Sequence, residues 1–106
     1  MNILAWLIFL GAALLEVSGD ATIRRGLRGS NLALVVGGFI ALGCYGLVVN
    51  SVKWDFSKLI GVYVAFFAVV SVLVGRLIFK EVIPPSTWWG VALIVAGGAV
   101  IQFGHR

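Results

Sequence analysis

Two acidic side chains, Glu16 and Asp20, lie inside an apolar stretch that begins at Ile3. Residues four positions apart share one face of an α-helix, so a helix here would place the two carboxylates one turn apart. Glu16 would then lie roughly 20 Å along the helix axis, within a hydrocarbon core about 30 Å thick. An ionised group at the centre of a membrane helix costs ~2.5–3.5 kcal/mol on insertion scales. We therefore predict that Glu16 is functional, because a carboxyl group that exchanges its proton for a cation can couple two transport steps.

Both acidic residues have a second interpretation. Arg24 lies one turn beyond Asp20, near the predicted edge of the membrane, where the two would form an interfacial ion pair. Alternatively, Asp20 is a second acidic station on the path of a proton or cation. Glu16 itself could be a carboxyl group held in a structural hydrogen bond. The sequence leaves these alternatives open.

The predicted neighbours of Glu16 on the helix surface are mostly small. Ala12 and Ala13 lie on one side of it and Gly19 on the other, with Phe9 one turn further away. Spacings of three, four and seven residues put all of them on one face. Small side chains let a partner helix approach closely, and they leave room for a ligand beside the carboxylate.

Further candidates for binding lie later in the chain. Tyr63 and either Phe66 or Phe67 share a helix face, and their rings could contact an organic cation. Packing or contact with lipid is the alternative role for these aromatic residues. Tyr45 and Asn50 are polar enough to need partners inside a membrane, either across helices or in a cavity.

The composition indicates that membrane-spanning helices position these residues. The chain is 61% hydrophobic and 11% charged, whereas soluble domains carry about 25% charged residues. The alternating pattern of membrane β-strands does not occur in the sequence. Four apolar stretches approach the ~20 residues that cross a bilayer as a helix, and they cover residues 3–21, 32–52, 59–79 and 87–103. We predict an all-α membrane protein with a single four-helix transmembrane domain over residues 1–106 and no soluble domain.

The links between the predicted helices are short, so neighbouring helices should run antiparallel. Ser86 is the predicted N-cap of the fourth helix, because a serine hydroxyl accepts a hydrogen bond from the first turn. Trp54, Trp88 and Trp89 fall at predicted boundaries with water, where indole rings anchor membrane helices. Basic residues are nearly balanced between the two sides, which leaves the orientation open.

Several classes of function are disfavoured. The chain contains one histidine and one cysteine, Cys44, which has no intrachain disulfide partner. The sequence shows neither a metal-ligand cluster nor a nucleophile–base pair, so we expect no enzyme, no metal site and no cofactor. The net charge of +4 is spread over helix ends, which suits anionic lipid headgroups better than nucleic acid.

Gly90 and Gly97 lie a heptad apart in the fourth predicted helix. Small residues repeated along one seam favour close contact between helices in lipid. This contact is either between two chains or within one chain. A second chain is expected on other grounds, because four helices are too few to enclose an aqueous cavity that opens to both sides.

Two segments resemble a known family. The run Gly-Ala-Ala-Leu-Leu-Glu-Val-Ser-Gly over residues 11–19, followed by a basic Arg24, resembles the first helix of small multidrug resistance transporters. The run Trp-Gly-Val-Ala-Leu-Ile-Val-Ala-Gly-Gly over residues 89–98 resembles their fourth helix, which forms the dimer contact. The spacing from Phe79 and Glu81 to this run also resembles the wider drug/metabolite transporter superfamily. The resemblance covers nearly the whole chain.

The resemblance implies an antiparallel homodimer in the bacterial inner membrane. In this family a pair of glutamates, here Glu16 of each chain, is shared by protons and cationic substrates that are exported. The third helix departs from the family pattern, because residues 66–68 are Phe-Phe-Ala where Trp-Ser-Gly usually follows the tyrosine matched by Tyr63. Asp20 likewise replaces a residue that is commonly uncharged, so the site is expected to be more acidic than usual.

We therefore expect a proton-coupled antiporter that exports small organic cations or guanidinium-like compounds. Its partners would be protons, the substrate, the lipid bilayer, and a second copy or a paired homologous chain. One alternative is a subunit of a flippase for lipid-linked substrates, in which Arg76 and Lys80 would carry more weight. The other is an accessory membrane subunit without transport, which needs no titrating carboxyl group at membrane depth.

Overall fold

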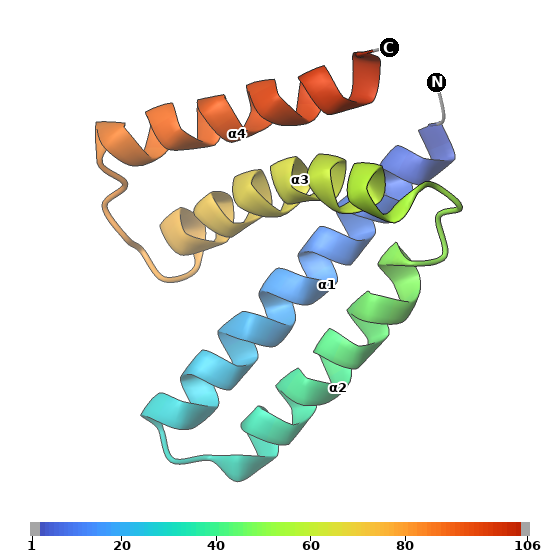
Figure 1. Cartoon of the computed structure of the whole chain (residues 1–106). Helices are drawn as coiled ribbons and strands as arrows, with labels where there is room; N and C mark the ends of the chain where they lie inside the picture. The colour runs from blue at the N-terminus through green and yellow to red at the C-terminus, as the bar shows by residue number, and fades with distance from the viewer. Residues whose placement is uncertain (1–2, 105–106) are drawn as a thin grey trace. The chain divides into compact units, whose positions relative to one another are not determined.

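The computed structural model describes residues 3–104, which form four α-helices joined by short links (Figure 1). The helices are α1 (Ile3–Arg28), α2 (Leu32–Val49), α3 (Phe56–Leu77) and α4 (Pro85–Phe103). No strand occurs within residues 3–104. All four helices are long and apolar enough to cross a membrane. The predicted class, an all-α membrane protein with four transmembrane helices, is confirmed.

The helices pair into two hairpins. One compact unit contains α1 and α2, and the other, which begins at Lys53, contains α3 and α4. The two helices of each hairpin run antiparallel (Figure 1), as their short links require. The assignment of residues 1–106 to a single four-helix domain stays a prediction.

Glycines bring the backbones of α1 and α2 into direct contact. A Cβ atom added at Gly38 would lie 2.7 Å from the carbonyl oxygen of Gly19 and would also overlap the side chain of Ile23. A Cβ atom added at Gly19 would lie 3.0 Å from Leu42 Cδ2 and 3.2 Å from Ala41 Cβ. Such spacing is available only to glycine, and it gives two membrane helices the close packing that stabilises them in lipid.

The first helix is longer than the apolar pattern predicted. It continues beyond residue 21 to Arg28 and has 26 residues, so residues predicted to form the link belong to α1. Arginine is a good helix former, and a basic side chain near a helix C-terminus interacts favourably with the helix dipole. A helix of this length spans roughly 39 Å, so its last turns extend beyond a hydrocarbon core about 30 Å thick.

The remaining link is short and has defined geometry. Ser30 adopts a left-handed conformation with φ 53°, and Asn31 then caps α2 by accepting a hydrogen bond from the Leu34 backbone N–H (3.3 Å). At the other end, α2 stops at Val49 instead of the predicted residue 52. The Asn50 side chain donates to the Gly46 carbonyl (2.8 Å), and such local bonds compete with continuation of the helix.

The second hairpin is held by a different pair of glycines. A Cβ atom added at Gly61 of α3 would lie 2.7 Å from Ile101 Cδ1, and one at Gly98 of α4 would lie 3.0 Å from Ala65 Cβ. Gly98 is the only residue of α4 that is buried. The α3–α4 contact therefore runs through these residues.

Two prolines mark the boundary between the α3–α4 link and α4. Lys80 is left-handed with φ 56°, and the Glu81 backbone N–H donates to the Gly75 carbonyl of α3 (3.0 Å). The fourth helix begins at Pro85, with Pro84 as its N-cap. The prediction that Ser86 is the N-cap is wrong, because proline is favoured in the first turn, where its missing N–H has no intrahelical role.

Candidate functional site

The length of α1 sets the depth of Glu16. The axial rise from Glu16 to Arg25 is roughly 14 Å, close to half of a hydrocarbon core about 30 Å thick. If the arginines at the end of α1 reach the headgroups, Glu16 would lie near the centre of the bilayer. Its side chain is half-buried. The functional role predicted for Glu16 stays a prediction.

The predicted face around Glu16 is buried. Phe9, Ala12 and Ala13 are each 0% exposed, and Gly19 is buried against α2. Buried small residues on both sides let other backbone approach the glutamate closely. The carboxyl group therefore emerges from a closely packed part of α1.

The register of the first hairpin places Tyr45 opposite Glu16. The contacts between the two helices come in pairs, which are Gly26 with Val35, Ile23 with Gly38, and Gly19 with Leu42. Each step of three or four residues toward the start of α1 matches an equal step toward the end of α2. The next step leads from Gly19 to Glu16 on one helix and from Leu42 to Tyr45 on the other.

Electrostatics agrees with this register. Tyr45 interacts with the charges of Glu16 and Asp20, and the influence of Glu16 is the larger. A tyrosine hydroxyl donates a hydrogen bond to an ionised carboxylate and accepts one from a protonated carboxyl group. The sequence indicates that Tyr45 needs polar partners but does not say which. The structure brings it to the two carboxylates from the opposite helix.

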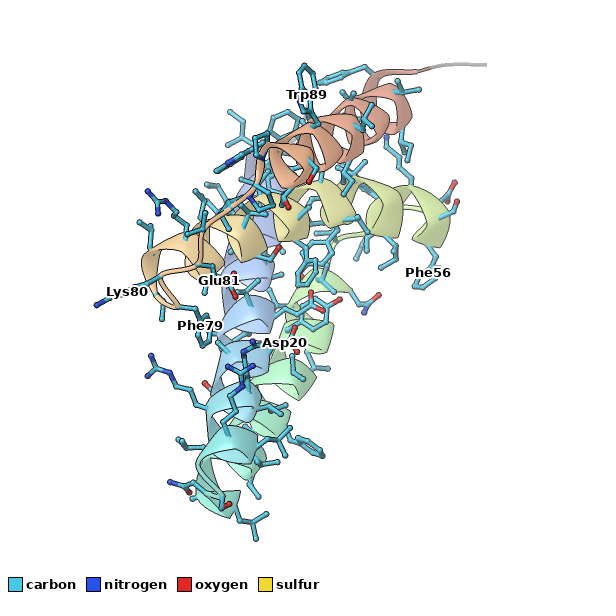
Figure 2. The ribbon with its side chains drawn as sticks, turned by 90° about the vertical axis from the view of Figure 1, so that its left-hand side faces the viewer. Asp20, Phe56, Phe79, Lys80, Glu81 and Trp89 are labelled. Carbon is cyan, nitrogen blue, oxygen red and sulfur yellow. The ribbon has the colours of Figure 1, made fainter. Side chains whose placement is uncertain are left out.

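Asp20 is exposed on α1, one turn from Glu16 toward the arginine end (Figure 2). Its charge acts on Tyr45, so it belongs to the same group of residues. Both roles considered for Asp20, the ion pair with Arg24 and the second acidic station, stay predictions.

The predicted aromatic residues lie on the other hairpin. Tyr63 of α3 is 3% exposed, and its ring lies 6.4 Å from that of Phe67 between centroids, at an interplanar angle of 36°. Phe66 is half-buried on the same helix. A contact of Tyr63 or Phe66 with substrate stays a prediction.

The two glycines predicted for the dimer contact face open space. A Cβ atom added at Gly90 or Gly97 would meet no described atom within 4 Å. Gly98, the neighbour of Gly97, is the residue of α4 that packs against α3. Packing within the hairpin therefore does not use this seam, and a contact with a second chain stays a prediction.

Within residues 3–104, no three histidine, cysteine, aspartate or glutamate side chains are grouped so that they could hold a metal ion. Cys44 is a free, exposed thiol on α2. The expectations of no cofactor and no enzymatic activity stay predictions.

Comparison with known proteins finds relatives along nearly the whole chain. A UPF0060 membrane protein of Pseudomonas fluorescens strain Pf0-1 is 35% identical, and the match covers 97% of this chain and 96% of the relative. Another from Pseudomonas fluorescens strain Pf-5 is 33% identical with the same coverage. One from Mycolicibacterium vanbaalenii is 32% identical over 94% of each chain. Neither a family model nor a solved structure matches the chain.

The chain belongs to the family of UPF0060 membrane proteins. With four helices able to cross a membrane and bacterial relatives named as membrane proteins, it is an integral inner-membrane protein. The predicted localisation is confirmed.

Proposed function

We propose that this UPF0060 membrane protein is a proton-coupled antiporter that exports small organic cations or guanidinium-like compounds. The observation that carries the proposal is the half-buried Glu16 within α1, a helix able to cross a membrane, with Tyr45 opposite it and Asp20 one turn away. An acidic residue inside a membrane helix is costly and is rarely present without a function.

The energetics of Glu16 favour exchange of a proton for a cation. Ionisation at the membrane centre costs ~2.5–3.5 kcal/mol. A cation about 4 Å away attracts the carboxylate by about 4 kcal/mol at an effective dielectric constant of about 20. The protonated form and the cation-bound ionised form are thus both favoured over the ionised form alone. Proton and cation therefore compete for one carboxyl group, which is the requirement for antiport.

Two neighbours would tune this competition. The Tyr45 hydroxyl can donate to the ionised form of Glu16, which stabilises the state that binds the cation. Asp20 adds negative charge on the path toward the arginine end of α1 and so favours entry of cations. Tyr45 would thus act through a hydrogen bond to Glu16, and Asp20 through its charge.

The transporter would contain at least two chains. Four helices are too few to form a gated aqueous path, and the open seam at Gly90 and Gly97 offers a surface for a second α4. The resemblance to small multidrug resistance transporters supports an antiparallel homodimer. A paired homologous chain would meet the same requirement.

The test is transport by reconstituted protein. In proteoliposomes with an imposed pH gradient, guanidinium or a quaternary ammonium ion should be driven across the membrane and should release protons. Glu16→Gln keeps the size of the side chain and removes its titration, so coupled transport should fall to background. Glu81→Gln makes the same chemical change in an exposed link and should transport normally.

Substantial proton-driven transport by Glu16→Gln would refute the proposal. Loss of activity in both variants would point to a folding defect, which circular dichroism distinguishes. If Glu16→Gln is without effect while neutralising Arg76 and Lys80 abolishes function, the flippase alternative gains the support.

A further inference from the structure

One face of α1 points away from α2 and carries leucines followed by arginines. We call Leu7, Leu10, Leu14, Arg25 and Arg28 the leucine–arginine face. Together with Ser18 and Ala21 between them, successive members are three or four residues apart, so they form one stripe along the helix. The α1 residues that contact α2, which are Gly19, Ile23 and Gly26, do not belong to it.

The leucines of this face are open. Leu7 is 60% exposed, Leu10 is 43% and Leu14 is 50%. In a membrane helix such side chains face acyl chains, since no water is present at this depth. The leucine–arginine face is therefore an apolar track that ends in two cations.

The arginines provide the polar end of this face. Arg25 and Arg28 are both exposed in the last turn of α1, and the adjacent Arg24 is exposed as well. A guanidinium group binds phosphate oxygens in a bidentate manner. Three guanidinium groups within two helical turns favour a ligand with a net negative charge over one whose phosphate is neutralised by its own cation.

The dimensions match one lipid molecule. The axial rise from Leu14 to Arg25 is roughly 16 Å, and one leaflet of the hydrocarbon core is about 15 Å thick. A phosphate bound by the arginines would therefore place its acyl chain along Ala21, Ser18 and Leu14. We propose that the part of the leucine–arginine face from Leu14 to Arg28 is a binding site for an anionic phospholipid. This proposal does not rest on the proposed transport function.

The test compares two lipid probes on the full chain. The protein is reconstituted in phosphatidylcholine, and electron paramagnetic resonance measures the association of spin-labelled phosphatidylglycerol and of spin-labelled phosphatidylcholine. We expect the anionic probe to be preferred. Arg25→Gln with Arg28→Gln should reduce that preference by about fivefold for each arginine at low salt. Lys53→Gln with Lys80→Gln removes the same charge from two exposed lysines and should retain the preference.

Three outcomes would overturn the proposal. The first is an unchanged preference in the arginine double variant when circular dichroism shows a native helix content. The second is displacement of the lipid probe by soluble glycerol phosphate, which would indicate a site for free phosphate only. The third is absence of any lipid preference together with a change of oligomeric state in Leu10→Ala with Leu14→Ala, which would assign the face to a second copy of the chain.

Discussion

The contact between Gly38 and α1 makes a quantitative prediction for the first hairpin. In Gly38→Ala the new methyl group would lie 2.7 Å from the Gly19 carbonyl oxygen and would overlap Ile23. The carbonyl belongs to the backbone, so the helices must separate to relieve the overlap. Overpacking of this kind destabilises by about 1–3 kcal/mol.

The adjacent glycine provides a matched control. In Gly37→Ala the methyl group meets nothing within 4 Å. Replacing glycine by alanine inside a helix gains about 0.5–1 kcal/mol from backbone entropy, and this gain is common to both variants. Gly38→Ala should therefore be less stable than Gly37→Ala by about 1–3 kcal/mol, the overpacking term alone.

The free energy of unfolding can be measured by titrating the protein in mild detergent with a denaturing detergent and following helix content. Transport gives a second readout, because the same contact sets the register that places Tyr45 opposite Glu16. Gly38→Ala should lose transport and Gly37→Ala should keep it. Equal stability and equal transport of the two variants would refute the close contact between α1 and α2 at Gly38.

Three further predictions concern the site and the dimer. Tyr45→Phe removes only the hydroxyl that can stabilise ionised Glu16, so the affinity for a cation, measured by calorimetry, should fall by roughly tenfold; unchanged affinity would exclude a role for the hydroxyl. Asp20→Asn should weaken cation uptake without abolishing it, and complete loss with intact folding would make Asp20 essential. Gly97→Leu should reduce cross-linking of two chains and leave the hairpin stable, because its side chain enters open space. Gly98→Leu should instead destabilise the α3–α4 hairpin, and the opposite pattern would assign the seam to packing within one chain.

Local sequence was sufficient for the class of the protein. Long apolar stretches can satisfy their backbone in a membrane only as helices, so the four membrane helices followed from composition and spacing. The ends of the helices were less accurate. Three of residues 24–28 are arginines, which are polar but good helix formers and let α1 continue, whereas Asn50 ends α2 through a side-chain bond to the Gly46 carbonyl. Hydropathy measures neither effect.

The tertiary structure decided which polar and small residues meet. Tyr45 comes to Glu16 only because the close contact of Gly19 with Gly38 fixes the register of two antiparallel helices. Likewise, the rotation of α4 about its own axis selects Gly98 for the contact with α3 and leaves Gly90 and Gly97 open. Helices that are apolar all round do not encode which side faces a partner. The sequence therefore determines that these helices span the membrane, while the fit between their surfaces determines what each side chain faces.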